Sequence, residues 1–430
     1  MIAPELGTGP KAYVRLLRYP PAAGPFVSAL VARLTVSMAP IGLLLEVQSE
    51  RHAYGGAGIV TGAYAIGIAI GSPVWGRAMD RAGQRRTLLV TSLVSALLLA
   101  ADAISAARNA PMAALVLLAF VAGLAFPPIS PAIRSAWRVI FPDQASRRVA
   151  FALDATAMEL SFVAGPLLLS AILALTNPVV PVLVAAGCMA GGGIAYCRTA
   201  AARNAPALHS GDQAPHHAAH HRSAITVPGV ASVLVVMLML SVGFGQLDTS
   251  MAGTAGRILG GNDRVGLLFM CIAGGSGVGG LIYGSKNWAL EERRTLPMTT
   301  GAFGILLAGI ATAVGSGHPH LWVLMPLLFG TGLTIAPSLI MQQGLLDQLT
   351  PPNRLNEAQS LLSSVNQVGA AAGTAVAGVV IDSHGLFWSF IGAAAAVALC
   401  CLSAFAGNAR WSRLVTAPDR ASAAVDVGAD

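Results

Sequence analysis

Long apolar runs occupy most of the sequence between residues 24 and 407, separated by short stretches that contain charged residues or Pro and Gly. A helix needs roughly 20 apolar residues to cross about 30 Å of hydrocarbon, and about twelve runs of that length are present. They are predicted at 24–47, 56–76, 87–107, 111–136, 149–174, 178–198, 227–249, 264–285, 296–315, 320–346, 357–381 and 386–407. The pattern predicts an all-α polytopic membrane protein with 12 transmembrane helices.

The composition excludes a water-soluble globule. Hydrophobic residues make up 55% of the chain and charged residues only 10%, whereas soluble domains contain about 25% charged residues. The five cysteines lie in or beside apolar runs without the spacing of metal ligands, so they are interpreted as core residues. No nucleophile elbow, phosphate-binding loop or zinc motif occurs in the sequence. An enzyme, or a sensor without transport activity, is therefore disfavoured.

The basic residues predict the orientation in the membrane, because Lys and Arg beside short loops stay on the cytoplasmic side. Nearly all of them adjoin one set of loops, and only Arg51, Arg108, Arg257 and Arg264 adjoin the other. Both termini are therefore predicted to be cytoplasmic. The net charge of +7 reflects this topology and does not indicate a nucleic-acid partner. Two lysines among abundant Arg and Ala favour a GC-rich bacterial genome, and so a bacterial cytoplasmic membrane.

The two halves of the sequence resemble each other. An offset of 208 positions superposes Gly67 on Gly275, Gly71 on Gly279 and the pair Arg85-Arg86 on Arg293-Arg294. This duplication predicts two pseudo-symmetric six-helix bundles. The predicted parts are a cytoplasmic N-terminal segment (1–23), a first bundle (24–198), a cytoplasmic linker (199–226), a second bundle (227–407) and a cytoplasmic tail (408–430).

The predicted linker is rich in histidine. His216 with His220, and His217 with His221, would each share one face of a helix, a spacing that can hold a metal ion. No Cys accompanies them, the linker has a single carboxylate at Asp212, and Pro215 lies beside the histidines. A flexible solvated stretch without bound metal is the favoured interpretation.

A tight, charged turn joins the second and third predicted spans. Its residues are Gly76, Asp80, Arg81, Gly83, Arg85 and Arg86. This pattern resembles the G-x-x-x-D-R-x-G-x-R-R loop between the second and third helices of major facilitator superfamily transporters. The resemblance implies the fold of that superfamily and transport of a small molecule by alternating access. It also implies a monomer without cofactors and a central cavity lined by the first, fourth, seventh and tenth helices.

The same resemblance implies that Asp80 acts as a latch at the cytoplasmic gate. Its carboxylate would meet the start of the eleventh helix near Asn356 or Glu357, which carries partial positive charge. Arg134 and Arg138 at the end of the fourth span are candidate partners, and Gly83 would allow the tight turn. The alternative is that the arginines of the turn serve only to fix topology.

Small residues recur at intervals of about four in four spans, a spacing that lets membrane helices pack closely. The resemblance places these helices between the two halves, the second against the eleventh and the fifth against the eighth. Packing alone explains the small residues and is the favoured interpretation; a sliding surface for rocking of the two halves is the alternative. The residues are Gly62, Gly67 and Gly71; Gly275, Gly279, Gly280 and Gly284; Gly369, Gly373 and Gly378; and Ala157, Ser161, Ala164 and Gly165.

Ionisable residues within the spans are candidates for proton coupling, since a charge near mid-bilayer costs roughly 3 kcal/mol or more. Counted from the predicted helix ends, Arg33 and Glu159 lie at similar depth, about 15 Å, and Asp154 lies nearer the surface. An Arg33–Glu159 pair is predicted, with a role in coupling or a purely structural one. Secondary candidates are Gln246 and Asp248, followed by Asp102, Gln342, Gln343, Asn366 and Gln367.

The fifth span contains Gly165-Pro166, the core of a G-x-x-x-G-P-x-x-G-G element found in the superfamily's drug and metabolite exporters. Ser161 replaces the first glycine and Leu169-Ser170 the last pair. The resemblance implies export of a small organic molecule driven by the proton gradient. Proton-coupled uptake of a sugar or organic acid is the alternative, and facilitated diffusion without protons is a third.

Overall fold

The computed structural model describes residues 10–141, 143–204, 224–285, 291–316, 321–351 and 355–415. Within these ranges the regular structure is helical and no strand occurs. Twelve of the described helical segments are long and apolar enough to cross a membrane. The predicted all-α polytopic fold is therefore confirmed. Most of the His-rich linker, with all four histidines considered for metal binding, lies outside the described residues.

The chain forms two compact units. The first comprises residues 1–217 together with 261–269, and the second comprises 218–260 and 270–430. The helices of the first unit are α1 (Pro10–Arg18), α2 (Pro20–Arg51), α3 (Tyr54–Ala82), α4 (Gln84–Ala107), α5 (Met112–Leu124), α6 (Ile129–Ile140), α7 (Gln144–Leu173), α8 (Val179–Arg198) and α9 (Ala200–Asn204). The 3₁₀ helix η2 (Asn262–Arg264) and the start of α11 (Val265–Ser285) group with them.

The rest of α11 belongs to the second unit. The other elements of that unit are η1 (Ala224–Thr226), α10 (Val230–Arg257), α12 (Glu292–Gly315), α13 (Leu321–Leu349), α14 (Leu355–Ser383) and α15 (Leu386–Val415).

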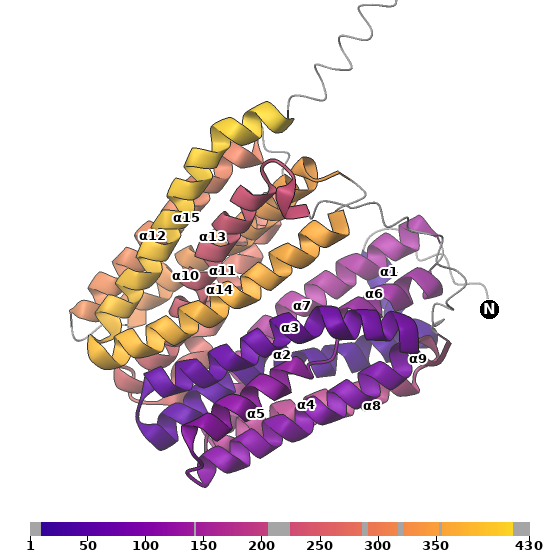
Figure 1. The fold of residues 1–430 in the computed structure, drawn as a ribbon, viewed down its shortest axis with the longest axis horizontal. Coiled ribbons are helices and arrows are strands. Elements are labelled where there is room, and N and C mark those ends of the chain that lie inside the picture. The colour runs from indigo at the N-terminus through magenta and orange to yellow at the C-terminus, as the bar shows by residue number, and fades with distance from the viewer. Residues whose placement is uncertain are drawn as a thin grey trace, which may run out of the picture. The chain divides into compact units, whose positions relative to one another are not determined.

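The helices pack in the same pattern within each unit, as the duplicated sequence predicts. In the first unit α2 packs against α7 and α8, and α4 packs against α5 and α8 (Figure 1). In the second unit α10 packs against α14 and α15, and α12 packs against α13 and α15. Large apolar side chains such as Leu97, Leu175 and Ile305 are exposed on these bundles, as expected of surfaces that face lipid.

The repeated glycines bring helix backbones into direct contact. A Cβ atom at Gly67 would lie 2.2 Å from the carbonyl oxygen of Phe120, and one at Gly275 would lie 2.1 Å from that of Phe329. Such a carbon cannot be accommodated unless the helices separate. The equivalent contacts recur at Gly71 with Leu124, Gly279 with Leu333, Gly123 with Tyr64, and Gly332 with Ile272. The duplication therefore preserves the α3–α5 contact of the first unit as an α11–α13 contact in the second.

This packing corrects one expectation. The resemblance placed the small residues of the second, eighth and eleventh spans between the two halves, but six of them contact helices of their own unit. The six are Gly67 and Gly71 against α5, Gly275 and Gly279 against α13, and Gly369 and Gly373 against α10. For these glycines the favoured interpretation of close packing is confirmed, with neighbours inside the unit, and the alternative of a sliding surface between halves is not supported, because a neighbouring backbone fills their open face.

Gly279→Ala is expected to destabilise the second unit by about 1–3 kcal/mol, the cost of overpacking a close contact. The new Cβ atom would lie 2.2 Å from the oxygen of Leu333. Gly277→Ala is the matched control in the same helix, because no described atom lies within 4 Å of a Cβ placed there. Thermal melting of the purified protein in detergent measures the difference. Equal melting temperatures for the two variants would contradict the packing.

The fourth predicted span is interrupted. Residues 111–136 were expected to form one helix, but α5 ends at Leu124 and α6 begins at Ile129. Pro127 and Pro128 lie in the gap and have no backbone N–H to donate. The carbonyl oxygen of Leu124 instead accepts a hydrogen bond from the indole nitrogen of Trp75, at 2.6 Å. A side chain of α3 thus satisfies a carbonyl that the interruption leaves free.

Candidate functional site: the polar contact between α2 and α7

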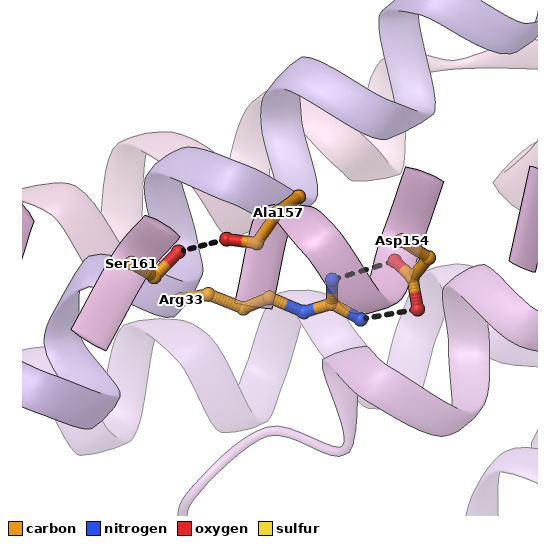
Figure 2. Close-up of polar contacts among 4 residues, drawn as sticks. All are labelled: Arg33, Asp154, Ala157 and Ser161. Atoms are coloured by element: carbon orange, nitrogen blue, oxygen red, sulfur yellow. Dashed lines mark hydrogen bonds and ion pairs between the residues drawn. The ribbon is translucent and has the colours of Figure 1, made fainter. Parts of the chain in front are cut away.

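A buried ion pair joins α2 and α7 within the first unit. The guanidinium of Arg33 donates from Nη1 to Oδ1 of Asp154 at 2.6 Å and from Nη2 to Oδ2 at 3.3 Å (Figure 2). The two side chains are only 3% and 5% exposed. Two parallel N–H···O bonds between planar groups are the strong, directional form of such a pair. The arrangement keeps both charges compensated inside a membrane-spanning bundle.

The partner of Arg33 differs from the predicted one. The depth argument favoured Glu159, but the structure pairs Arg33 with Asp154; the side chain of Glu159 lies outside the described residues. Depth does not explain this pairing, because α2 begins at Pro20 and α7 at Gln144, each before its predicted start. Arg33 then lies about 20 Å along α2, between Asp154 at about 15 Å and Glu159 at about 22 Å along α7.

Asp143 fixes this earlier start of α7. Its carboxylate caps the helix by accepting a hydrogen bond from the backbone N–H of Ser146 at 2.7 Å. This bond lowers the pKa of Asp143 below its ordinary value, because it stabilises the charged form. The cap therefore acts at neutral pH and weakens when the pH falls below the pKa of Asp143. In this way a residue in the loop before α7 sets where the helix begins.

Beyond the ion pair, α2 and α7 remain in close contact. Ser37, one turn after Arg33, donates its hydroxyl to the carbonyl oxygen of Ser161 at 2.9 Å. Ser161 in turn donates to the carbonyl oxygen of Ala157 at 2.9 Å (Figure 2). A Cβ atom at Gly165 would lie 1.9 Å from the hydroxyl oxygen of Ser37. Gly165, followed in the helix by Pro166, is thus needed for the approach of α2.

The charged turn between α3 and α4 contains a glycine with positive φ, as its sequence predicts. Gly83 separates the two helices and has φ of 84°, a conformation that favours glycine. The basic side chains of the turn and of α6 are exposed. These are Arg81, Arg85, Arg86, Arg134 and Arg138. No described atom lies within 4 Å of a Cβ placed at Gly76, and the side chain of Asp80 lies outside the described residues.

Three polar candidates in the second unit have different surroundings. Gln246 of α10 is buried, and its side-chain oxygen accepts no hydrogen bond from any described group. Asp248, two residues further on, is exposed on the surface of the unit. Asn366 of α14 accepts a hydrogen bond from Ser241 at 2.7 Å and so has a structural partner.

Sequence reasoning missed one buried charge and gave another little weight. Glu46 was placed at the end of the first predicted span and was not considered, and Asp102 was considered only as a weak candidate. Both side chains are 0% exposed. The signal that could have found Glu46 is its position after Leu43-Leu44-Leu45 and before Val47, inside the apolar run.

The fold defines a class of protein, a polytopic helical membrane protein built from two repeated bundles. The family model described as Major Facilitator Superfamily matches residues 25–344 and 255–423, which together cover most of the sequence. The chain therefore belongs to the major facilitator superfamily. It is a transporter of that superfamily and not an enzyme.

Solved transporters share this fold. The nucleoside transporter NupG is 12% identical with a TM-score of 0.69, and the match covers 89% of this chain and 99% of that one. A peptide transporter, POT, is 15% identical with a TM-score of 0.71, over 91% and 95% of the two chains. A bacterial homologue of the iron transporter ferroportin, in an inward-facing state, is 12% identical with a TM-score of 0.69, over 90% and 97%. At these identities the likeness is one of fold alone. A comparison with curated proteins gives no significant match.

Proposed function

We propose that this chain exports a small organic molecule in exchange for protons, by alternating access. The observation that carries the proposal is the buried ion pair between Arg33 and Asp154. Ionisable groups inside a membrane protein are costly and commonly mark ion or proton pathways. A carboxylate that can exchange its arginine partner for a proton provides a means of coupling.

In this mechanism the protonation of Asp154 alternates with its pairing to Arg33. When the carboxylate is ionised, the two hydrogen bonds hold α2 against α7. When it is protonated, the attraction between the two side chains is lost, and the positively charged Arg33 must find another partner or be solvated. A change in the α2–α7 contact would then follow each proton transfer. Glu159 on the same helix is a second candidate for this role.

The α2–α7 contact also supports export over uptake. Gly165-Pro166 is the part of this helix that resembles drug and metabolite exporters, and Gly165 packs directly against Ser37 beside the ion pair. In the second unit, the exposed Asp248 favours contact with water, because a carboxylate facing lipid is costly. We assign Asp248 and Gln246 to the lining of the substrate pathway.

The proposal includes an orientation and a gate. The exposed arginines at the turn between α3 and α4 favour a cytoplasmic location for this end of the first unit. Both termini would then be cytoplasmic, with the protein a monomer in a bacterial cytoplasmic membrane. Asp80 would act as the latch of the cytoplasmic gate, with Arg134 or Arg138 as partners.

Proton-coupled uptake is the second candidate, because the buried ion pair would serve it equally well. A thermal-shift screen of the purified protein against varied solutes, at two pH values, first identifies a compound that binds. Accumulation of that compound is then measured in proteoliposomes with an imposed pH gradient. An exporter that exchanges solute for protons accumulates it when the lumen is acidic, and a symporter does so when the lumen is alkaline. Equal accumulation under both gradients would contradict proton coupling.

A further inference from the structure

Two carboxylates are buried in the first unit with no hydrogen-bond partner among the described residues. They are Glu46 on α2 and Asp102 on α4, each 0% exposed. None of their four oxygen atoms accepts a hydrogen bond from a described group. A buried ionised carboxylate without a donor or a counter-ion costs several kcal/mol. The fold must therefore provide something that compensates for this cost.

The two carboxylates lie near the same end of the first unit. Each lies five residues before the end of its helix, Arg51 for α2 and Ala107 for α4, which puts both about 8 Å from the same end of the bundle. The helices α2 and α4 are in contact, and the charge of Asp102 acts on Glu46. This end is opposite to the charged turn between α3 and α4.

Among the described residues, no Arg, Lys or His side chain forms an ion pair with Glu46 or Asp102. The other charge that acts on Glu46 is the carboxylate of Glu50, one helical turn further toward the end of α2. The guanidinium of Arg51 donates to the carbonyl oxygen of Ala110 and so ties the end of α2 to the loop after α4. Two neighbouring carboxylates in a low dielectric do not both ionise, so a bound proton is the simplest compensation.

We propose that Glu46 and Asp102 form a proton-binding pair, separate from the Arg33–Asp154 ion pair and reached from the opposite end of the bundle. A proton from water forms the O–H bond of one carboxyl group, which donates a hydrogen bond to the other carboxylate. On release the O–H bond breaks and the proton returns to water. Glu46 lies thirteen positions after Arg33, about 20 Å further along α2. The role of this pair in coupling rests on the proposed proton-driven transport.

Infrared spectroscopy of the purified protein tests proton binding without transport. The wild type is titrated with acid and base, and the absorption of protonated carboxyl groups is followed. The variants Glu46→Gln and Asp102→Asn keep the side-chain shape and are expected to lose or displace the titration step of the pair. The control Asp263→Asn removes an exposed carboxylate and is expected to leave that step in place.

Two results would overturn the inference. One is a double variant, Glu46→Gln with Asp102→Asn, that titrates like the wild type. The other is a shift of the titration step when sodium replaces a bulky organic cation, since this would make the pair a metal-cation site. Melting temperatures of all variants are measured in parallel. If one single variant melts at a lower temperature than the wild type, the test relies on the other single variant.

Transport assays separate this inference from the proposed function. The Glu46→Gln and Asp102→Asn variants are expected to lose accumulation driven by a pH gradient while keeping exchange of solute at equal pH. If the wild type itself shows no gradient-driven accumulation, the proposed function fails, and the infrared result alone decides whether the pair binds a proton. If the wild type and both variants accumulate solute equally, the pair's role in coupling fails while the proposed function stands.

Discussion

Asp154→Leu and Arg33→Leu are each expected to destabilise the protein by about 3–5 kcal/mol, because each leaves one buried charge without its partner. Both variants are also expected to lose transport. The double variant with Leu at both positions is expected to recover part of the lost melting temperature, since apolar residues can replace a buried ion pair, less the cost of fitting Leu where the smaller Asp154 lay. Melting in detergent and transport in proteoliposomes are measured for all three.

The double variant separates structure from mechanism. If the ion pair couples transport to protons, the double variant folds but no longer responds to a pH gradient. A double variant that transports like the wild type would make the pair purely structural. The control is Asp382→Asn, which breaks an exposed ion pair with Arg257 and is expected to cost at most about 1 kcal/mol.

Asp80→Asn is expected to insert and fold normally and to lose most of its transport activity. Asp80 lies in the last turn of α3, where the helix end carries partial negative charge, so its carboxylate does not stabilise its own helix. Acidic residues also contribute little to orientation in the membrane. The proposed role as the latch of the cytoplasmic gate accounts for a carboxylate among four exposed arginines: Arg77, Arg81, Arg85 and Arg86.

Initial transport rates in proteoliposomes measure this effect. The melting temperature and elution profile of the purified variant serve as the test of folding. Arg77→Gln is the matched control, because Arg77 is an exposed arginine of α3 that does not belong to the resembling pattern. Transport by Asp80→Asn at the wild-type rate would contradict the proposed role of Asp80 as a latch.

The fold could be predicted from the sequence because lipid imposes simple rules on a chain. Each span must satisfy its backbone internally and must be about 20 apolar residues long, so the runs in the sequence correspond to helices. The duplication was equally visible, since Gly67 and Gly71 have counterparts at Gly275 and Gly279. The structure explains why these glycines survived in both copies, because each contacts a carbonyl oxygen of a neighbouring helix.

The partners of individual residues could not be predicted in the same way. A small-residue spacing indicates that a helix is approached closely but does not identify the neighbour, so the glycines of α3 were assigned to the wrong helix. The start of α7 was set by the cap at Asp143, outside the apolar run, and depth counted along the helices does not select the partner of Arg33. The interruption at Pro127 and Pro128 was hidden by the hydrophobicity of the segments on both sides.

Solute-driven proton movement tests the central claim most directly. Proteoliposomes contain a pH indicator, the membrane potential is clamped, and a solute identified by the thermal-shift screen is added outside without an imposed pH gradient. Exchange of solute for protons predicts that the lumen becomes alkaline as solute enters, whichever way the protein is oriented, and that the double Arg33→Leu, Asp154→Leu variant gives no such signal. An unchanged lumenal pH during solute entry through the wild-type protein would contradict the account.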